Sequence, residues 1–328
     1  MQKVDVEIKK DRIYAVVIIL AVVILTFMRS AYSPIYRYVF CPDSICYRIM
    51  TRGLLAGRIP YRDLFDHKGP LSYFIYAIGL LISGGRTWGM CLISCVINAI
   101  SFLFVYKTAR IRYCREVSLL GIAFVLFMCS LTNRSPLNTL NAPDDFLLLP
   151  LMVSAYLIFK EVASQKEGFD HLSRKTMFIT GIMCGAVLWI KLNVCLFYFA
   201  FIGCYFLWLI IKRRFKAFLE NTAVFLGGIA AMTVVALAFY AVTGTLGNLW
   251  ESYISFNLFY SSVRDAYWIF DKVLITFITK VSVSLMLLIC ALAFLLGLLT
   301  KRLTRQHIVT SILLLINYLV LTYFAVYD

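Results

Sequence analysis

Charged residues are scarce in this chain of 328 residues, where they make up 15% of the total, whereas soluble domains have about a quarter. Hydrophobic residues account for 62%, and the mean hydropathy is +0.84. This composition excludes an ordinary soluble domain. Because apolar runs long enough to cross a bilayer recur along the chain, the sequence predicts an all-α, polytopic integral membrane protein.

The chain also lacks the residues that usually hold a metal. It has three histidines, and its ten cysteines include no CxxC pair, the spacing typical of structural metal sites. These spacings support no metal site, so we expect no cofactor, and a divalent metal stays open as an alternative. The net charge of +15 would suit a nucleic-acid partner. However, the basic residues form short clusters between apolar runs, which is typical of membrane-protein loops, so we expect a lipid bilayer and no nucleic acid.

About nine transmembrane helices are predicted from the apolar runs. The stretch 177–211 is long for one span and short for two of ordinary length, and basic clusters flank both of its ends. We interpret it as two short helices that meet at an external turn near Lys191, because this keeps both clusters on the same side. The other predicted spans are 13–28, 87–106, 117–131, 146–159, 220–242, 273–299 and 308–327.

The distribution of basic residues predicts the orientation. The stretch 71–83 has 13 residues and is marginal for a span. If it does not cross, five loops that hold 19 of the 32 Lys and Arg residues face the cytoplasm. The positive-inside rule therefore favours an external interfacial helix at 71–83. The sequence predicts a plasma-membrane protein with a cytoplasmic N-terminus, an external C-terminus and external loops at 29–86, 132–145 and 243–272.

The first external loop is the richest in polar residues. Asp43 precedes an amphipathic helical pattern and is expected to be its N-cap, while Gly57 and Pro60 are expected to end the helix. A dense charged cluster follows and continues into an apolar stretch. Its members are Asp63, Asp66, His67 and Lys68. Such a cluster beside an interfacial helix suits an amphiphile with an anionic head.

Three motifs in this loop resemble those of a known superfamily. Asp43 opens a short helix, residues 54–61 read LLAGRIPY, and residues 66–70 read DHKGP. This order resembles the GT-C glycosyltransferases, and within them the bacterial branch related to protein O-mannosyltransferases and to the aminoarabinose transferase of lipid A. Two departures stand out: Ser44 replaces a frequent glutamate, and Gly69 replaces the first proline of a Lys-Pro-Pro turn.

Weaker likenesses to the same family extend over most of the chain. Residues 144–150 read DDFLLLP and resemble the family's second acidic site. A glycine-rich stretch, 185–193, ends in WIKLN and resembles its helix that ends in lysine. Residues 255–260 resemble its Phe-Asn-x-x-Tyr loop. The resemblance implies a single GT-C-like membrane domain over residues 1–328, which stops before the further C-terminal spans of larger relatives.

The resemblance also implies a reaction and its residues. The donor would be a sugar on a polyprenyl phosphate, and the external acceptor could be a glycan, a lipid or a protein. Asp43 would be the general base, and one base without a covalent intermediate would invert the anomeric carbon. Candidate ligands of the donor phosphate are Lys68, Lys191, His67 and Arg62. Candidate substrate-binding residues are Asp144, Asp145, Asp66 and Asn257.

Other functions remain open on the sequence alone. A lipid or solute transporter, or a flippase, would concentrate polar groups at the bilayer midplane, whereas this chain concentrates them in external loops. A polysaccharide-repeat polymerase would have a large external loop late in the chain. A non-catalytic protein of cell-envelope polysaccharide assembly is the third alternative.

Overall fold

The computed structural model describes residues 2–38, 42–131, 142–165 and 170–263. These residues form helices and turns with no strand, so the predicted all-α fold is confirmed. The helices are α1 (Gln2–Arg29), α2 (Pro42–Leu55), α3 (Pro70–Ile82), α4 (Trp88–Ala109), α5 (Arg115–Leu131), α6 (Ala142–Ser164), α7 (Arg174–Ile190), η1 (Leu192–Val194), α8 (Cys195–Ile211), α9 (Phe215–Val242), α10 (Leu246–Leu249), η2 (Trp250–Ser255) and α11 (Phe256–Val263).

The protein is a membrane protein by the length and composition of its helices. Four helices of the described ranges are long and apolar enough to cross a bilayer: Lys10–Arg29 within α1, α4, Phe146–Ser164 within α6, and α9. The stretch 177–211 forms two 17-residue helices, α7 and α8, with the break at Lys191, as predicted. The predicted spans 273–299 and 308–327 lie outside the described residues, so the count of nine stays a prediction.

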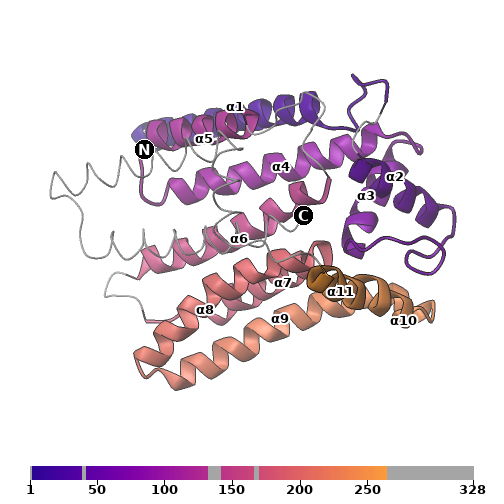
Figure 1. Cartoon of the computed structure of the whole chain (residues 1–328). Coiled ribbons are helices and arrows are strands. Elements are labelled where there is room, and N and C mark those ends of the chain that lie inside the picture. Colours follow the sequence, from indigo (N-terminus) through magenta and orange to yellow (C-terminus); the bar gives the residue numbers. More distant parts are fainter. Residues whose placement is uncertain (1, 39–41, 132–141, 166–169, 264–328) are drawn as a thin grey trace. The chain divides into compact units, whose positions relative to one another are not determined.

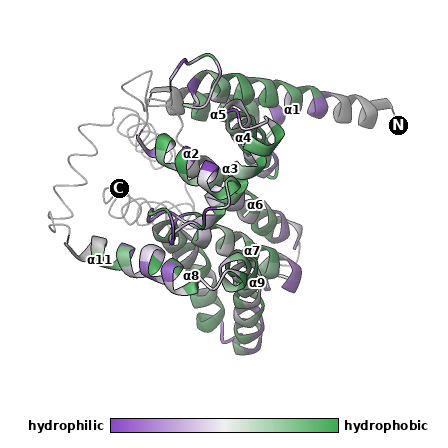
Figure 2. Ribbon diagram, turned by 90° about the vertical axis from the view of Figure 1, so that its right-hand side faces the viewer, coloured by the Kyte–Doolittle hydropathy of each residue, from purple (hydrophilic) through white to green (hydrophobic). Residues whose placement is uncertain are grey.

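The chain forms two compact units, residues 1–123 with 135–257, and residues 124–134 with 258–328. The contacts and sites described below belong to the first unit. Within it, α1 packs on α4, α4 on α6, α6 on α7 and α7 on α9, and these helices run side by side in Figure 1. Figure 2 shows that they are mostly hydrophobic, whereas α2 mixes hydrophobic and hydrophilic residues.

Close glycine contacts join α7 to α9. A Cβ atom added to Gly181 would lie 2.2 Å from the carbonyl oxygen of Phe225, and one added to Gly228 would lie 2.3 Å from that of Phe178. Small residues at such a seam let two membrane helices approach until their backbones touch. The indole of Trp189 also donates a hydrogen bond of 3.0 Å to Thr233 Oγ1. The seam therefore fixes the position of the C-terminal end of α7.

Helices α2 and α3 pack together, and α3 continues directly toward the start of α4 (Figure 1). Pro70 occupies the first turn of α3, which suits a residue without an N–H group. Tyr73, Tyr76 and Leu80 are fully buried. The predicted helix at 71–83 therefore exists, with one face buried against its neighbours. Its placement in the membrane interface stays a prediction.

The expectation that Asp43 is the N-cap is wrong, because α2 starts two residues earlier than predicted. Helix α2 begins at Pro42, so Asp43 lies in its first turn. Proline is favoured at the first helical position, because its fixed φ angle suits a helix and its missing N–H group has no partner there. Gly57 follows the helix with a positive φ of 82°. The helix therefore ends just before Gly57, as the sequence predicts.

Candidate active site

The start of α2 presents Asp43 to the surroundings. The Asp43 side chain is exposed, whereas the neighbouring Ser44 is fully buried. Tyr32, in the turn after α1, donates a hydrogen bond of 2.8 Å to the carbonyl oxygen of Ser44. This bond attaches the first turn of α2 to the rest of the unit. The structure thus holds an accessible carboxylate at a fixed helix N-terminus, where the helix dipole stabilises negative charge.

The carboxylate of Asp66 is buried and fully engaged, with 5% of the residue exposed. Tyr73 of α3 donates to its Oδ2 at 2.7 Å, and the Cys46 thiol of α2 donates to the same oxygen at 3.3 Å. The backbone N–H of His67 donates to Oδ1 at 2.7 Å. A buried carboxylate needs such partners to offset the loss of water. Asp66 therefore ties the charged loop to both α2 and α3.

The pKa of the Cys46 thiol is raised to about 12. Burial is the largest cause, and the negative charge of Asp66 adds to it, followed by the hydrogen bond to Asp66 and the charge of Asp43. The thiol is therefore protonated at neutral pH and can act as a donor to Asp66. It is not a nucleophile at neutral pH, because the thiolate is the reactive form.

The loop 66–70 docks on the C-terminal end of α7. The N–H of Gly69 donates a hydrogen bond of 3.1 Å to the carbonyl oxygen of Ile190. A Cβ atom at Gly69 would lie 2.2 Å from the carbonyl oxygen of Trp189, so only glycine fits there. A proline, which is common at this position in the family resembled, lacks the N–H that forms this bond. Lys68 and Lys191 are the residues next to this contact, one on each segment.

A third segment joins the same loop from η2 and α11. Asn257 Nδ2 donates a hydrogen bond of 2.7 Å to the carbonyl oxygen of His67. Tyr253 is fully buried, donates to the carbonyl oxygen of Leu188, and packs its ring 5.8 Å from that of Trp189. The loop after α2, the end of α7 and the segment 253–257 therefore form one hydrogen-bonded assembly.

The cations of this assembly differ in their surroundings. Lys68 and Lys191 are partly buried, and Lys191 follows α7 in an extended conformation. His67 Nδ1 lies 3.6 Å from Asp66 Oδ1. Arg62 is exposed and binds Asp63 at 2.8 Å. Arg62 and the N–H of Ile59 bind the carboxylate of Asp63 and lower its pKa to about 2.

The second acidic pair lies at the start of α6. Asp144 and Asp145 are in its first turn, and their side chains are outside the described part of the structure. The next residue, Phe146, is buried with its ring 4.7 Å from that of Tyr76 in α3. The backbone of the acidic pair therefore lies near α3. None of the described residues form a cluster of three metal-ligating side chains.

Buried tyrosines complete this region and were not foreseen from the sequence. Tyr61 has a positive φ of 71° and donates a hydrogen bond of 2.5 Å to the carbonyl oxygen of Lys68. Its ring packs against those of Tyr73 and Tyr240 at 6.2 and 5.6 Å. Burial raises the pKa of the Tyr61 hydroxyl, which therefore stays a hydrogen-bond donor. The only signal in the sequence was the high aromatic content of 16%.

Comparison with known proteins agrees with this arrangement. A profile of the dolichyl-phosphate-mannose-protein mannosyltransferase family matches residues 67–240, just over half of the chain. The match includes Lys68, Asp144, Asp145 and Lys191 and begins after Asp43 and Asp66. No curated protein and no solved structure matches the chain. The chain belongs to the dolichyl-phosphate-mannose-protein mannosyltransferase family and is a membrane glycosyltransferase of the GT-C type.

Proposed function

We propose that the protein transfers a sugar from a polyprenyl-phosphate donor to an acceptor on the non-cytoplasmic face of the membrane, with inversion at the anomeric carbon. Asp43 is the general base in this proposal. The family supports a lipid-phosphate sugar as donor and a bilayer as the setting. The positive-inside count supports the external location, because α2 and α3 lie at the other end of the first unit from its basic α4–α5 and α8–α9 turns (Figure 1).

The docking of loop 66–70 on α7 is the observation that carries the proposal. The bond between Gly69 and Ile190 joins two segments more than 100 residues apart, and each carries a lysine beside the contact. Among the described residues, Lys68 forms no ion pair with a carboxylate. A phosphate group is a suitable anion for two lysines held at a fixed turn.

The proposed reaction moves one proton and breaks one bond. The acceptor hydroxyl gives its proton to the Asp43 carboxylate, and its oxygen attacks the anomeric carbon. The bond between that carbon and the phosphate oxygen breaks, and its electron pair leaves with the polyprenyl phosphate. Lys68 and Lys191 stabilise the charge that develops on the leaving phosphate. Asp43 suits its role because it is exposed at a helix N-terminus.

The remaining candidates have narrower roles in the proposal. Asp66 positions the loop through Tyr73 and Cys46, in addition to its predicted contact with substrate. Asn257 positions His67 through the backbone. Arg62 is a weaker phosphate ligand, because Asp63 already binds its guanidinium. Asp144 and Asp145 remain candidates for binding substrate hydroxyls.

The test compares Asp43→Asn with Asp63→Asn. Both remove a carboxylate from an exposed side chain in the same loop, but only the first removes the proposed base. The assay measures release of polyprenyl phosphate from polyprenyl-phosphate mannose and from other polyprenyl-phosphate sugars. We expect Asp43→Asn to lower kcat by about 10²-fold or more with little change in donor binding, and Asp63→Asn to remain active.

Two other outcomes would change the proposal. Equal activity of Asp43→Asn and the wild type would leave the transferase intact and remove Asp43 as its base. Failure of the folded wild type to consume any donor, even with candidate acceptors, would favour a transporter or an assembly protein, and lipid translocation would be measured next.

A further inference from the structure

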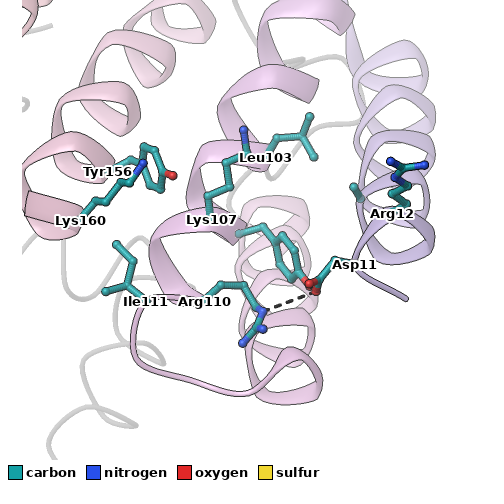
Figure 3. A pocket seen from close by; sticks show the side chains of 10 residues that line it. Asp11, Arg12, Leu103, Lys107, Arg110, Ile111, Tyr156 and Lys160 are labelled. Atoms are coloured by element: carbon teal, nitrogen blue, oxygen red, sulfur yellow. Dashed lines mark hydrogen bonds and ion pairs between the residues drawn. The ribbon is translucent and has the colours of Figure 1, made fainter. Parts of the chain in front are cut away.

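A second site lies at the opposite end of α4 from the candidate active site. Helix α4 starts beside α3 and runs for 22 residues, about 33 Å at 1.5 Å per residue. At its C-terminal end, α1, α4 and α6 surround a cavity of about 560 Å³ (Figure 3). The length of α4 is close to the thickness of the hydrocarbon core. The cavity therefore lies at the other membrane surface.

The cavity carries an excess of positive charge. Four basic residues line it, and Asp11 is the one acid among the lining residues. The Asp11 carboxylate is already engaged: Arg115 Nε lies 2.7 Å from Oδ1, Arg110 Nε lies 3.7 Å away, and Tyr106 donates a hydrogen bond of 3.1 Å. Asp11 therefore leaves most of the positive charge in the cavity uncompensated. The basic lining residues are Arg12, Lys107, Arg110 and Lys160.

Each of two lysines that line the cavity lies over an aromatic ring of its own helix. Lys107 Nζ lies 5.1 Å from the ring centre of Phe104, and Lys160 Nζ lies 5.7 Å from that of Tyr156. These two rings are themselves 5.5 Å apart across the seam of α4 and α6. Figure 3 shows both lysines directed toward the space between these helices. Neither forms an ion pair with a carboxylate of the described residues.

Positive charge that no carboxylate neutralises favours an anion in the cavity. Ala15, Leu103 and Ile111 add apolar surface to the cavity, which lies at the ends of helices that are long and apolar enough to cross a bilayer. A ligand that suits both parts has an anionic head and apolar chains. We propose that this cavity binds the phosphate headgroup of an anionic membrane lipid in the leaflet that faces the basic loops.

A lipid fits better than a soluble phosphate, because the cavity is built at the ends of membrane-spanning helices. Basic pockets between such helices are known to hold lipid headgroups. The proposal does not depend on the glycosyltransferase reaction, since none of its residues belongs to the candidate active site. It assigns a regulatory or stabilising lipid to the chain, bound about one bilayer thickness from the sugar donor.

The test uses the full-length protein in detergent and measures bound lipid by native mass spectrometry. The probes are phosphatidylglycerol and phosphatidylcholine with identical acyl chains. The variant Lys107→Gln/Lys160→Gln removes both cavity lysines. The control Lys175→Gln/Lys216→Gln removes two exposed lysines from the same end of the bundle, outside the cavity. Both double variants have the same net charge, so long-range attraction is matched.

We expect the wild type and the control to bind phosphatidylglycerol about tenfold more tightly than phosphatidylcholine, and the cavity variant to lose this preference. An equal loss in both double variants would show a general charge effect and would overturn the site. Inorganic phosphate serves as the competitor. If phosphate displaces phosphatidylglycerol and also binds alone with the same dependence on Lys107 and Lys160, the site is one for a soluble anion and the lipid assignment is wrong.

Discussion

At the scale of single residues, Asp66 shows how a charge can serve the fold and the site together. Its carboxylate accepts hydrogen bonds from α2, from α3 and from its own loop. Its presence in a charged cluster could be read from the sequence, but its burial could not. The donors Cys46 and Tyr73 come from two different helices, and they meet Asp66 only through tertiary packing.

The environment of Cys46 provides a test of this geometry. The substitution Asp66→Asn removes a negative charge and should lower the pKa of the Cys46 thiol, which is now about 12. A lower pKa means more thiolate at any pH below it, and the rate of alkylation follows the thiolate fraction. We expect iodoacetamide at about pH 8.5 to modify Cys46 faster in the variant than in the wild type.

Peptide mapping by mass spectrometry would measure this rate. Cys114 is exposed and distant from Asp66, so it serves as the internal control and should react equally in both proteins. An unchanged rate at Cys46, with Cys114 also unchanged, would contradict the contact between the thiol and the carboxylate.

At the scale of elements, basic clusters and glycine residues predicted several of the helix ends. The two basic clusters around 177–211 required an even number of crossings, and α7 and α8 are indeed two helices. The start of α2 differs from the prediction, because Pro42 suits the first helical position and Asp43 lies within the first turn. The docking of Gly69 on α7 was not predicted, because a contact between distant segments leaves no local pattern.

Neighbouring glycines in α9 test the seam between α7 and α9. A Cβ atom at Gly228 would lie 2.3 Å from the backbone of α7, whereas one at Gly227 would meet no atom within 4 Å. Alanine favours a helix by about 1 kcal/mol over glycine, but overpacking costs about 1–3 kcal/mol. We therefore expect Gly228→Ala to lower the thermal unfolding temperature and Gly227→Ala to leave it unchanged or raise it.

Unfolding of the two variants can be followed by a thiol-reactive dye in detergent. The comparison is matched, because both substitutions add the same methyl group to adjacent positions of one helix. If the two variants have the same stability, α7 and α9 are not in backbone contact at Gly228.

At the scale of the whole molecule, the proposed sugar-donor site and the proposed lipid site lie toward opposite ends of α4. The family, the fold and the membrane setting could all be predicted from composition, periodicity and the motifs of the first loop. The basic cavity between α1, α4 and α6 could not, because its lining residues come from separate helices and leave no local pattern in the sequence. The packing of the helices decides which basic side chains line the same cavity.

The orientation of the bundle in the membrane decides on which face sugar transfer occurs. We propose that sugar transfer occurs on the face that carries α2 and α3, opposite the N-terminus. The most direct measurement uses vesicles in which the N-terminus has a known side, fixed by the protease sensitivity of an N-terminal tag. Polyprenyl-phosphate mannose, then other polyprenyl-phosphate sugars, are supplied to one face together with a cell-envelope extract as the source of acceptor.

We expect release of polyprenyl phosphate only when the donor is supplied to the face opposite the N-terminus. Release from the N-terminal face would contradict the orientation and place the reaction near the basic loops. The folded protein could also consume no donor supplied to either face. The chain would then not be a transferase for these sugars, and the proposed function would be wrong.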